Sequence, residues 1–366
     1  MLSHEFTVEL PHSTSHAVWS PDGRILAAIP FVHPALQLIN ADTRERREWT
    51  APFPFQLLST AISPDNQFLA IHQPTKGANN LWLYSITDRR EIARAEFPLG
   101  GCSLSTQLTD GLAFSIDGSS LWVGCHIAKD VAGTYPAAAR LNLPDLRYQE
   151  RVDFAPIAGQ SLPHLRGSTF SSSGGKLLWT QILTVYATDH RPPRISQQFA
   201  HTIDLDTRQD VFPPLKIRTD PGGQLPSLLQ YAMVSPQQGI AVVFRKLIKK
   251  EPAPPTGTPD FTFETYDIHT GALLAEFWSA KDQQDVDSGG QVEHAALIPG
   301  SAYLVGAIDA SLNPRKHGGL ILWNVRTGTI VQRVPGRSTQ RVSVSPDGSR
   351  IALFSGQALL MYRSGR

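Results

Sequence analysis

The residue types that could do chemistry are dispersed along the chain. Four of them, His16, Asp110, Glu293 and His294, are of the types that bind divalent ions. Adjacent residues of a strand point to opposite sides, so Glu293 and His294 are not expected to share one ion. We predict no metal and no other cofactor. No GxSxG, HExxH, phosphate-cradling GxxxxGK[ST] or GxGxxG motif occurs, which leaves open an enzyme whose catalytic residues are dispersed.

Basic side chains gather in five segments that read as loops, at residues 72–80, 125–137, 183–199, 245–260 and 306–319. The segments contain ten Lys or Arg and five Asp or Glu, a balance of about +5 in a chain whose total is +1. Four histidines, His72 among them, add to it when protonated. This excess suits an anionic ligand or an acidic protein partner, although solvated loops also collect Lys and Arg for no functional reason. The candidate binding residues are Lys76, His126, Lys129, His190, Arg191, Arg194, Lys246, Lys249, Lys250, Arg315, Lys316 and His317.

A repeat explains how these segments would be positioned. A short alternating strand, a serine, a turn and an apolar run recur seven times, as in HAVWSPDGRILAAI and VSVSPDGSRIALFS. The serine falls at Ser20, Ser63, Ser115, Ser171, Ser235 and Ser345, with Ile298 in its place once; successive gaps are 43, 52, 56, 64, 63 and 47 residues. Repeats of this length built from short strands are typical of β-propellers.

Turn chemistry divides each repeat into four strands. In SPDG, proline presets φ, aspartate bonds nearby amides and glycine accepts a positive φ, which predicts a hairpin. A third strand then ends in Asn, Asp or Ser with Thr or Asp three residues later, as at Asn40 with Thr43 and at Asp267 with Thr270. We expect that side chain to cap a turn into a fourth strand.

The seventh repeat ends after its third strand, and an unassigned alternating segment lies at residues 6–10. That segment would complete the last unit and remove an open sheet edge. The sequence therefore predicts a single all-β domain over 1–366, a seven-bladed propeller of four-stranded antiparallel blades closed by an N-terminal strand. The predicted blade cores are 16–50, 57–97, 108–154, 166–213, 228–277, 292–334 and 340–366 plus 6–10.

SPDG and the aromatic-polar ends of third strands, such as Trp323-Asn324 and Tyr266-Asp267, resemble the WD-repeat propellers over nearly the whole chain. The chain lacks a Trp-Asp pair and the Gly-His signature, and its repeats exceed the usual length, so it resembles a divergent relative. Lactonase-type and TolB-type propellers share the SPDG hairpin, and the motif therefore indicates a fold and not an activity.

A second candidate site lies where the first strands begin. Connections between blades, and those between second and third strands, fall on one face, which we call the top face. Aligned first strands place charged and hydrogen-bonding side chains around the channel mouth there, at His16, Asp110, Arg166, Tyr231, Glu293, His294 and Arg341. They could hold a small polar ligand, or bond only to each other and to water.

Composition bounds the remaining expectations. Two cysteines, Cys102 and Cys125, are too few for a disulfide scaffold, and whether they pair is left open. Residues 1–10 do not read as a signal peptide, so a cytoplasmic location is expected. A charge near zero gives no sign of a nucleic-acid or membrane partner. We predict a non-enzymatic binding or scaffold propeller that engages its partner through the top face; the alternative is a lactonase-like or other hydrolase acting at the channel mouth.

Overall fold

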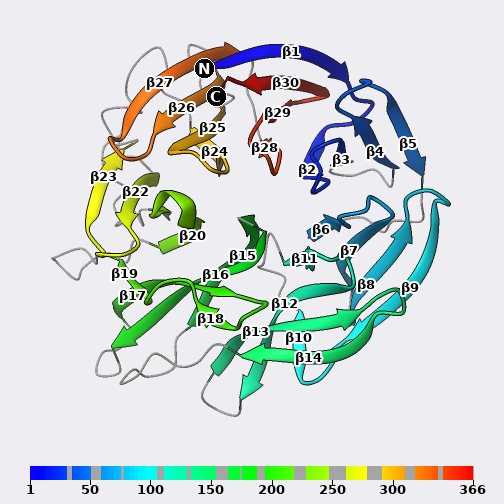
Figure 1. Ribbon diagram of the computed structural model, residues 1–366, viewed down its shortest axis with the longest axis horizontal. Helices are drawn as coiled ribbons and strands as arrows, with labels where there is room; N and C mark the ends of the chain where they lie inside the picture. Colours follow the sequence, from blue (N-terminus) through cyan, green and yellow to red (C-terminus); the bar gives the residue numbers. More distant parts are fainter. Residues whose placement is uncertain are drawn as a thin grey trace, which may run out of the picture.

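The computed structural model describes residues 1–30, 35–50, 59–75, 78–104, 111–129, 133–153, 164–173, 175–187, 194–217, 228–246, 261–277, 291–309, 318–336 and 341–365. In these ranges the chain forms strands β1 to β30 and one short 3-10 helix, η2 (Pro236–Gln238). The strands make seven antiparallel sheets, each of which is one blade. Figure 1 shows the blades arranged in a ring, which confirms the predicted all-β propeller. Within the described ranges, no helix has the length and apolar character needed to cross a membrane.

Blades 1 to 3 follow the chain in order. Blade 1 contains β2 (Thr14–Trp19), β3 (Ile25–Pro30), β4 (Ala35–Asn40) and β5 (Arg46–Thr50). Blade 2 contains β6 (Ser59–Ile62), β7 (Phe68–Thr75), β8 (Ala78–Ser85) and β9 (Arg90–Phe97). Blade 3 contains β10 (Cys102–Leu104), β11 (Leu112–Phe114), β12 (Ser120–Lys129), β13 (Gly133–Asn142) and β14 (Arg147–Asp153).

Blades 4 to 7 complete the ring. Blade 4 contains β15 (His164–Ser173), β16 (Lys176–Ala187), β17 (Arg194–Asp204), β18 (Gln209–Asp210) and β19 (Leu215–Ile217). Blade 5 contains β20 (Leu228–Ser235), β21 (Ile240–Lys246), β22 (Phe261–Asp267) and β23 (Leu273–Phe277). Blade 6 contains β24 (Gln291–Leu297), β25 (Tyr303–Asp309), β26 (Gly318–Asn324) and β27 (Thr329–Gly336). Blade 7 contains β28 (Arg341–Val344), β29 (Arg350–Ser355), β30 (Ala358–Ser364) and β1 (Leu2–Glu9).

The N-terminal strand closes the ring as predicted. β1 pairs antiparallel with β30 from Leu2 opposite Ser364 to Glu9 opposite Ala358, and Figure 1 shows the two chain ends side by side. β1 begins at Leu2, earlier than the expected segment 6–10. The additional paired residues at the start of β1 matter because Leu2 is itself buried.

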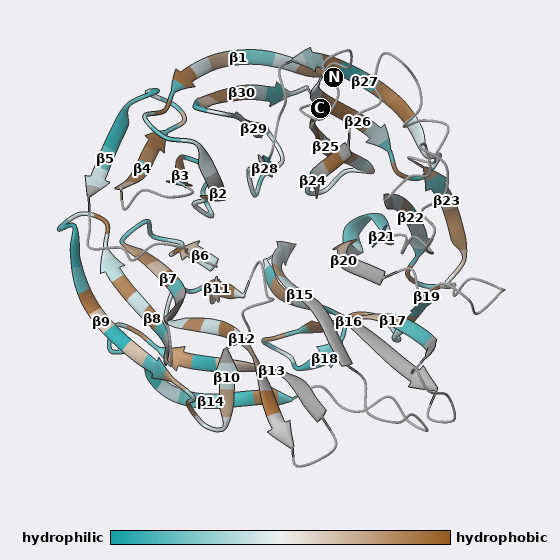
Figure 2. Cartoon of the chain, turned by 180° about the vertical axis from the view of Figure 1, so that it is seen from behind, coloured by the Kyte–Doolittle hydropathy of each residue, from teal (hydrophilic) through white to brown (hydrophobic). Residues whose placement is uncertain are grey.

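The core is divided among the blade interfaces. Seven clusters of buried side chains lie between successive blades, and the last joins blade 7 to blade 1. β1 contributes Leu2 to the cluster between blades 6 and 7 and Phe6 to the cluster between blades 7 and 1. The outermost strands alternate between hydrophilic and hydrophobic residues (Figure 2), as expected for a sheet with one solvated side.

The turn predicted after the third strand forms. After the third strand, Asn40 Oδ1 accepts the amides of Asp42 and Thr43 at 2.9 Å each, and Asp267 Oδ1 accepts those of His269 and Thr270. These short polar side chains satisfy amides that the strands leave free.

Three of the segments expected to be loops are largely strand, which corrects their boundaries. The β7–β8 ladder continues to Thr75 opposite Ala78, and the β12–β13 ladder continues to Lys129 opposite Gly133. The β16–β17 ladder ends at Ala187 opposite Arg194. A polar stretch of sequence that contains proline is interpreted as a loop. Two neighbouring strands that extend beyond the core can nevertheless pair their backbone groups.

Candidate functional site at the turn face

The face opposite the top face carries the turns that join first and second strands, and we call it the turn face. In blade 1, the Ser20 hydroxyl donates to Asp22 Oδ1 at 2.6 Å, and the Arg24 amide donates to the same oxygen at 3.0 Å. The Ile25 amide donates to Ser20 Oγ at 2.8 Å. Three other turns repeat this arrangement, at Ser63 and Asp65, Ser115 and Asp117, and Ser345 and Asp347.

Hydrogen bonds of this kind lower the pKa of two of the turn carboxylates, those of Asp22 and Asp117. The hydroxyl of Ser115, with the amide and hydroxyl of Ser119, lowers the pKa of Asp117 to about 2. Burial tends to raise the pKa of Asp22, but hydrogen bonds from the Ser20 hydroxyl and the Arg24 amide outweigh it, so that pKa is lowered. At neutral pH the turn face therefore presents fixed negative charge beside the channel.

A cavity of about 1200 Å³ opens at the turn-face end of the channel. The innermost strands contact one another in a closed ring, β28–β2–β6–β11–β15–β20–β24–β28, and all seven blades contribute residues to the cavity. We call this opening the turn-side mouth. Residues from β26, β27 and the ends of β1 and β30 extend its lining outward over blades 6 and 7.

The side chains around the turn-side mouth are mainly apolar. In six of the seven repeats the residue after the landmark position is proline or isoleucine: Pro21, Pro64, Ile116, Pro236, Pro299 and Pro346. All of these except Pro236 line the cavity. Turn chemistry alone explains a proline there, and sequence reasoning therefore missed this surface. The recurring apolar residue was the signal that could have revealed it.

Charge at the turn-side mouth is negative. Asp22 and Asp347 are the only Asp, Glu, Lys, Arg or His residues among its lining residues in the described chain, and the lining also contains the Met1 ammonium, which donates to Gly365 O at 3.3 Å. The charge of the nearby Arg24 guanidinium acts on Asp22, whereas two other nearby cations pair away from the mouth. Arg350 donates to Asp42 at 2.7 Å, and Lys176 lies 2.8 Å from Asp204.

The candidate residues at the opposite, top-face mouth coincide with irregular backbone. Ladder register shifts, typical of β-bulges, occur between Thr14 and His16, Leu165 and Gly167, Leu229 and Tyr231, and Val292 and His294. The skipped residues include Arg166 and Glu293. A bulge disturbs alternation along a strand, so the alternation argument that separated Glu293 from His294 does not apply. No group of three or more metal-binding side chains occurs among the described residues.

The structure describes only some atoms of the candidate residues at the top-face mouth. His16, Arg166, Tyr231 and Glu293 have described backbone on first strands, whereas the described side chains of His294 and Arg341 are half-buried. Asp110 lies outside the described residues. The candidate set at the top-face mouth therefore stays a prediction.

The basic candidates are likewise divided. His126 and Lys129 lie on β12, Arg194 begins β17 and Lys246 ends β21, so these four are strand residues at the top-face ends of their strands. Outside the described residues lie Lys76, His190, Arg191, Lys249, Lys250, Arg315, Lys316 and His317.

Two further residues counted toward the basic excess do not belong to it. Arg245 is 2% exposed and donates to Glu264 at 2.9 Å. His72 is buried on β7, and this burial lowers its pKa to about 4, so it is neutral at pH 7. Without these two residues in the count, the positive charge expected at the top face is smaller.

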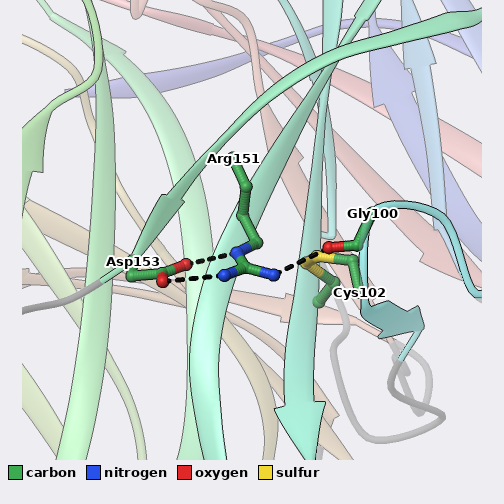
Figure 3. Close-up of a disulfide and its surroundings, with 5 residues drawn as sticks. Gly100, Cys102, Arg151 and Asp153 are labelled. Carbon is green, nitrogen blue, oxygen red and sulfur yellow. Dashed lines mark hydrogen bonds and ion pairs between the residues drawn. A yellow bond between two sulfur atoms is a disulfide. The ribbon is translucent and has the colours of Figure 1, made fainter.

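The connection from blade 2 to blade 3 is fastened by a disulfide, a pairing that the sequence left open. Cys102 on β10 and Cys125 on β12 are fully buried and bonded. Beside them, Arg151 donates to both Asp153 oxygens and, at 2.7 Å, to Gly100 O (Figure 3). Disulfides are rare in the reducing cytosol, and alkylation of thiols inside cells would test the predicted cytoplasmic location.

Comparison with known proteins shows the fold alone. No model of a protein family matches the chain, and no curated protein matches it. Among solved structures, hydrazine synthase of Kuenenia stuttgartiensis is similar, with a TM-score of 0.61, 16% identity, and coverage of 98% of this chain and 97% of that one. The Cps50 (Swd1) β-propeller domain of Myceliophteria thermophila matches with a TM-score of 0.57, 12% identity and 100% coverage of both chains.

Proposed function

We propose that this propeller is a non-enzymatic binding platform that holds a partner protein at the axis of the ring. The observation that carries the proposal is the turn-side mouth, a cavity of about 1200 Å³ to which every blade contributes. A closed ring of packed blades positions its lining without needing a partner, and such preorganisation lowers the entropic cost of binding. Exposed apolar side chains at a concave surface are typical of interaction sites.

The top face is a second binding surface in this proposal, for an acidic protein or an anionic ligand. What supports it is the position of Lys129, Arg194 and Lys246 at the strand ends of that face. The two faces then differ in charge, since the turn-side mouth carries Asp22 and Asp347. A partner protein and a second ligand could therefore be held at opposite ends of one channel.

Retention of partners from a lysate of the source cells tests the platform and separates its faces. We would compare the wild type with an Ile116→Lys/Tyr303→Lys variant and with a variant carrying Glu at Lys246, Lys249, Lys250, Arg315 and Lys316. A partner lost only from the first variant supports the turn-side mouth, and one lost only from the second supports the top face. Recovery of the same proteins by the wild type and both variants, or turnover of a hydrolase substrate by the wild type, would overturn the proposal.

A further inference from the structure

We propose a separate site, away from the turn-side mouth, for a small organic molecule that carries one carboxylate and a short apolar tail. The site is a cavity of about 260 Å³ between blades 1 and 2, and we call it the blade 1–2 pocket. Its lining includes three apolar and three charged side chains: Ile25, Leu38, Ile86, Glu45, Arg47 and Arg89. The proposal goes beyond the platform function and does not depend on it.

A comparison of the turns after the third strands first points to this pocket. Four blades place a residue other than glycine at the fifth position of this turn, where φ is positive: Arg44, Arg89, Leu146 and Arg208. Three of these side chains contact the preceding blade of the ring. Arg44 lies over the ring of Phe6 on β1. Leu146 packs in the cluster between blades 2 and 3, and Arg208 donates to Glu150 on β14.

Arg89 is the exception among the four. It lines the pocket together with five residues of blade 1, yet it makes no hydrogen bond, ion pair or ring contact with any residue that the structure describes. The carboxylate of Glu45 is already engaged, because it accepts Nε of Arg47 at 2.8 Å and Nη2 at 3.2 Å. Asp88 lies 3.7 Å from Arg90 and is not part of the lining. A strained backbone is thus kept for an unpaired cation, and such strain gathers at functional sites.

The charge of the lining selects a monovalent anion. The described lining contains two arginines, one glutamate and no other ionisable side chain, a balance of +1. Because Glu45 and Arg47 pair with each other, the unpaired charge is that of Arg89. A carboxylate brings one negative charge and fits the planar guanidinium with two parallel hydrogen bonds. A phosphate monoester brings nearly two charges at pH 7, which this lining does not balance.

The apolar part of the lining determines the rest of the ligand. Ile25, Leu38 and Ile86 are partly buried, and all three pack against the core cluster between blades 1 and 2, which holds them in place. A hydrocarbon tail that covers them removes apolar surface from water. The volume of about 260 Å³ is below the ~300–1,000 Å³ of sites for drug-sized molecules, so the tail is short. Hexanoate meets these requirements and serves as the probe.

NMR titration of methyl-labelled protein tests the site directly. Ile25 and Ile86 line the pocket, so their δ1-methyl signals report binding at the proposed place. The probes are hexanoate, hexanol, which keeps the tail without the charge, and acetate, which keeps the charge without the tail. We expect hexanoate to shift both signals and to bind about tenfold more tightly than either of the others. Its affinity should fall as salt is raised.

Variants at one turn position separate Arg89 from a general loss of charge. Arg89→Gly should weaken hexanoate binding about tenfold, and it should fold, because glycine accepts a positive φ. Arg208→Gly is the matched control: it removes an arginine from the same position of the turn in blade 4 and should leave hexanoate binding unchanged. Arg89→Glu reverses the balance of the lining to −1, so hexylammonium should then shift the two methyl signals in place of hexanoate.

Hexanoate that binds no more tightly than hexanol would overturn the proposal. Equal weakening by Arg89→Gly and Arg208→Gly would do the same, and so would an Arg89→Glu protein, folded as judged by thermal unfolding, that still prefers hexanoate to hexylammonium. These outcomes are distinct from failure of the platform function. The blade 1–2 pocket shares no lining residue with the turn-side mouth, and partner retention from lysate is therefore measured independently of it.

Discussion

At the scale of single residues, the burial of His72 makes the free energy of unfolding depend on pH. Its ring is buried on β7, its Nε2 makes no hydrogen bond to the described residues, and its pKa falls from 6.5 to about 4. Between these pH values the unfolded chain binds a proton that the folded chain does not. The free energy of unfolding therefore decreases as pH falls from about 6.5 to 4, by up to ~3 kcal/mol.

His72→Leu should remove this part of the pH dependence, because leucine does not titrate. Urea denaturation of the variant and the wild type between pH 7 and 4 would measure the difference in their free energies of unfolding. The exposed His4→Gln change on β1 serves as the control and should leave the slope as in the wild type. A His72→Leu protein with the wild-type slope would show that His72 binds protons equally in the folded and unfolded states.

At the scale of elements, the turns after the third strands contain a strain that some blades have relieved. The fifth residue of this turn has a positive φ: 64° at Arg44, 54° at Arg89 and 60° at Arg208. Blades 5 and 6 use glycine there, with φ of 72° at Gly271 and 69° at Gly328. A left-handed conformation costs a residue with a side chain roughly 1–2 kcal/mol.

Arg89→Gly should therefore stabilise the protein. The gain should stay below about 1 kcal/mol, because glycine also has more freedom to lose on folding. Arg90→Gly is the matched control: it places glycine in β9, where the backbone is extended, and should lower stability by ~0.5–1 kcal/mol. Urea midpoints of the two variants measure both effects, and a loss in Arg89→Gly as large as that in Arg90→Gly would contradict the strain.

Repeat chemistry made the elements predictable. The landmark serines and the capping Asn40 and Asp267 act on amides two to five residues away, so a local pattern determines them. The extension of β12 to Lys129, the division of the fourth strand of blade 4 into β18 and β19, and the disulfide between Cys102 and Cys125 depend on contacts remote in sequence. Local patterns carry no information on these.

At the scale of the whole molecule, the sequence placed both candidate sites on the top face and gave the turn face none. Long polar segments are interpreted as loops, whereas Pro21 and Pro64 were explained by turn geometry alone and Ile116 was not identified. Only closure of the ring brings the turns of seven blades around one axis, and this converts separate turn residues into a single surface. The basic candidates at the top face and the lactonase-like alternative stay predictions.

Closure of the ring of blades depends on β1. Phe6 packs in the cluster between blades 7 and 1, and Arg44 lies over its ring at 5.1 Å. Phe6→Ala should lower the free energy of unfolding by ~3–5 kcal/mol, a large part of the ~5–15 kcal/mol that proteins have. Ser3→Ala, exposed on the same strand, should change little.

Removing β1 altogether tests closure directly, because β30 would then present an unpaired edge. A protein lacking residues 1–9 should aggregate at concentrations where the wild type is monodisperse by light scattering. A synthetic peptide of residues 1–10 should suppress this aggregation by pairing with β30, and a peptide with Ala in place of Leu2 and Phe6 should not, since it lacks the side chains that enter the two interface clusters. A shortened protein that stays monodisperse would show that six complete blades hold the ring without the strand that joins its ends.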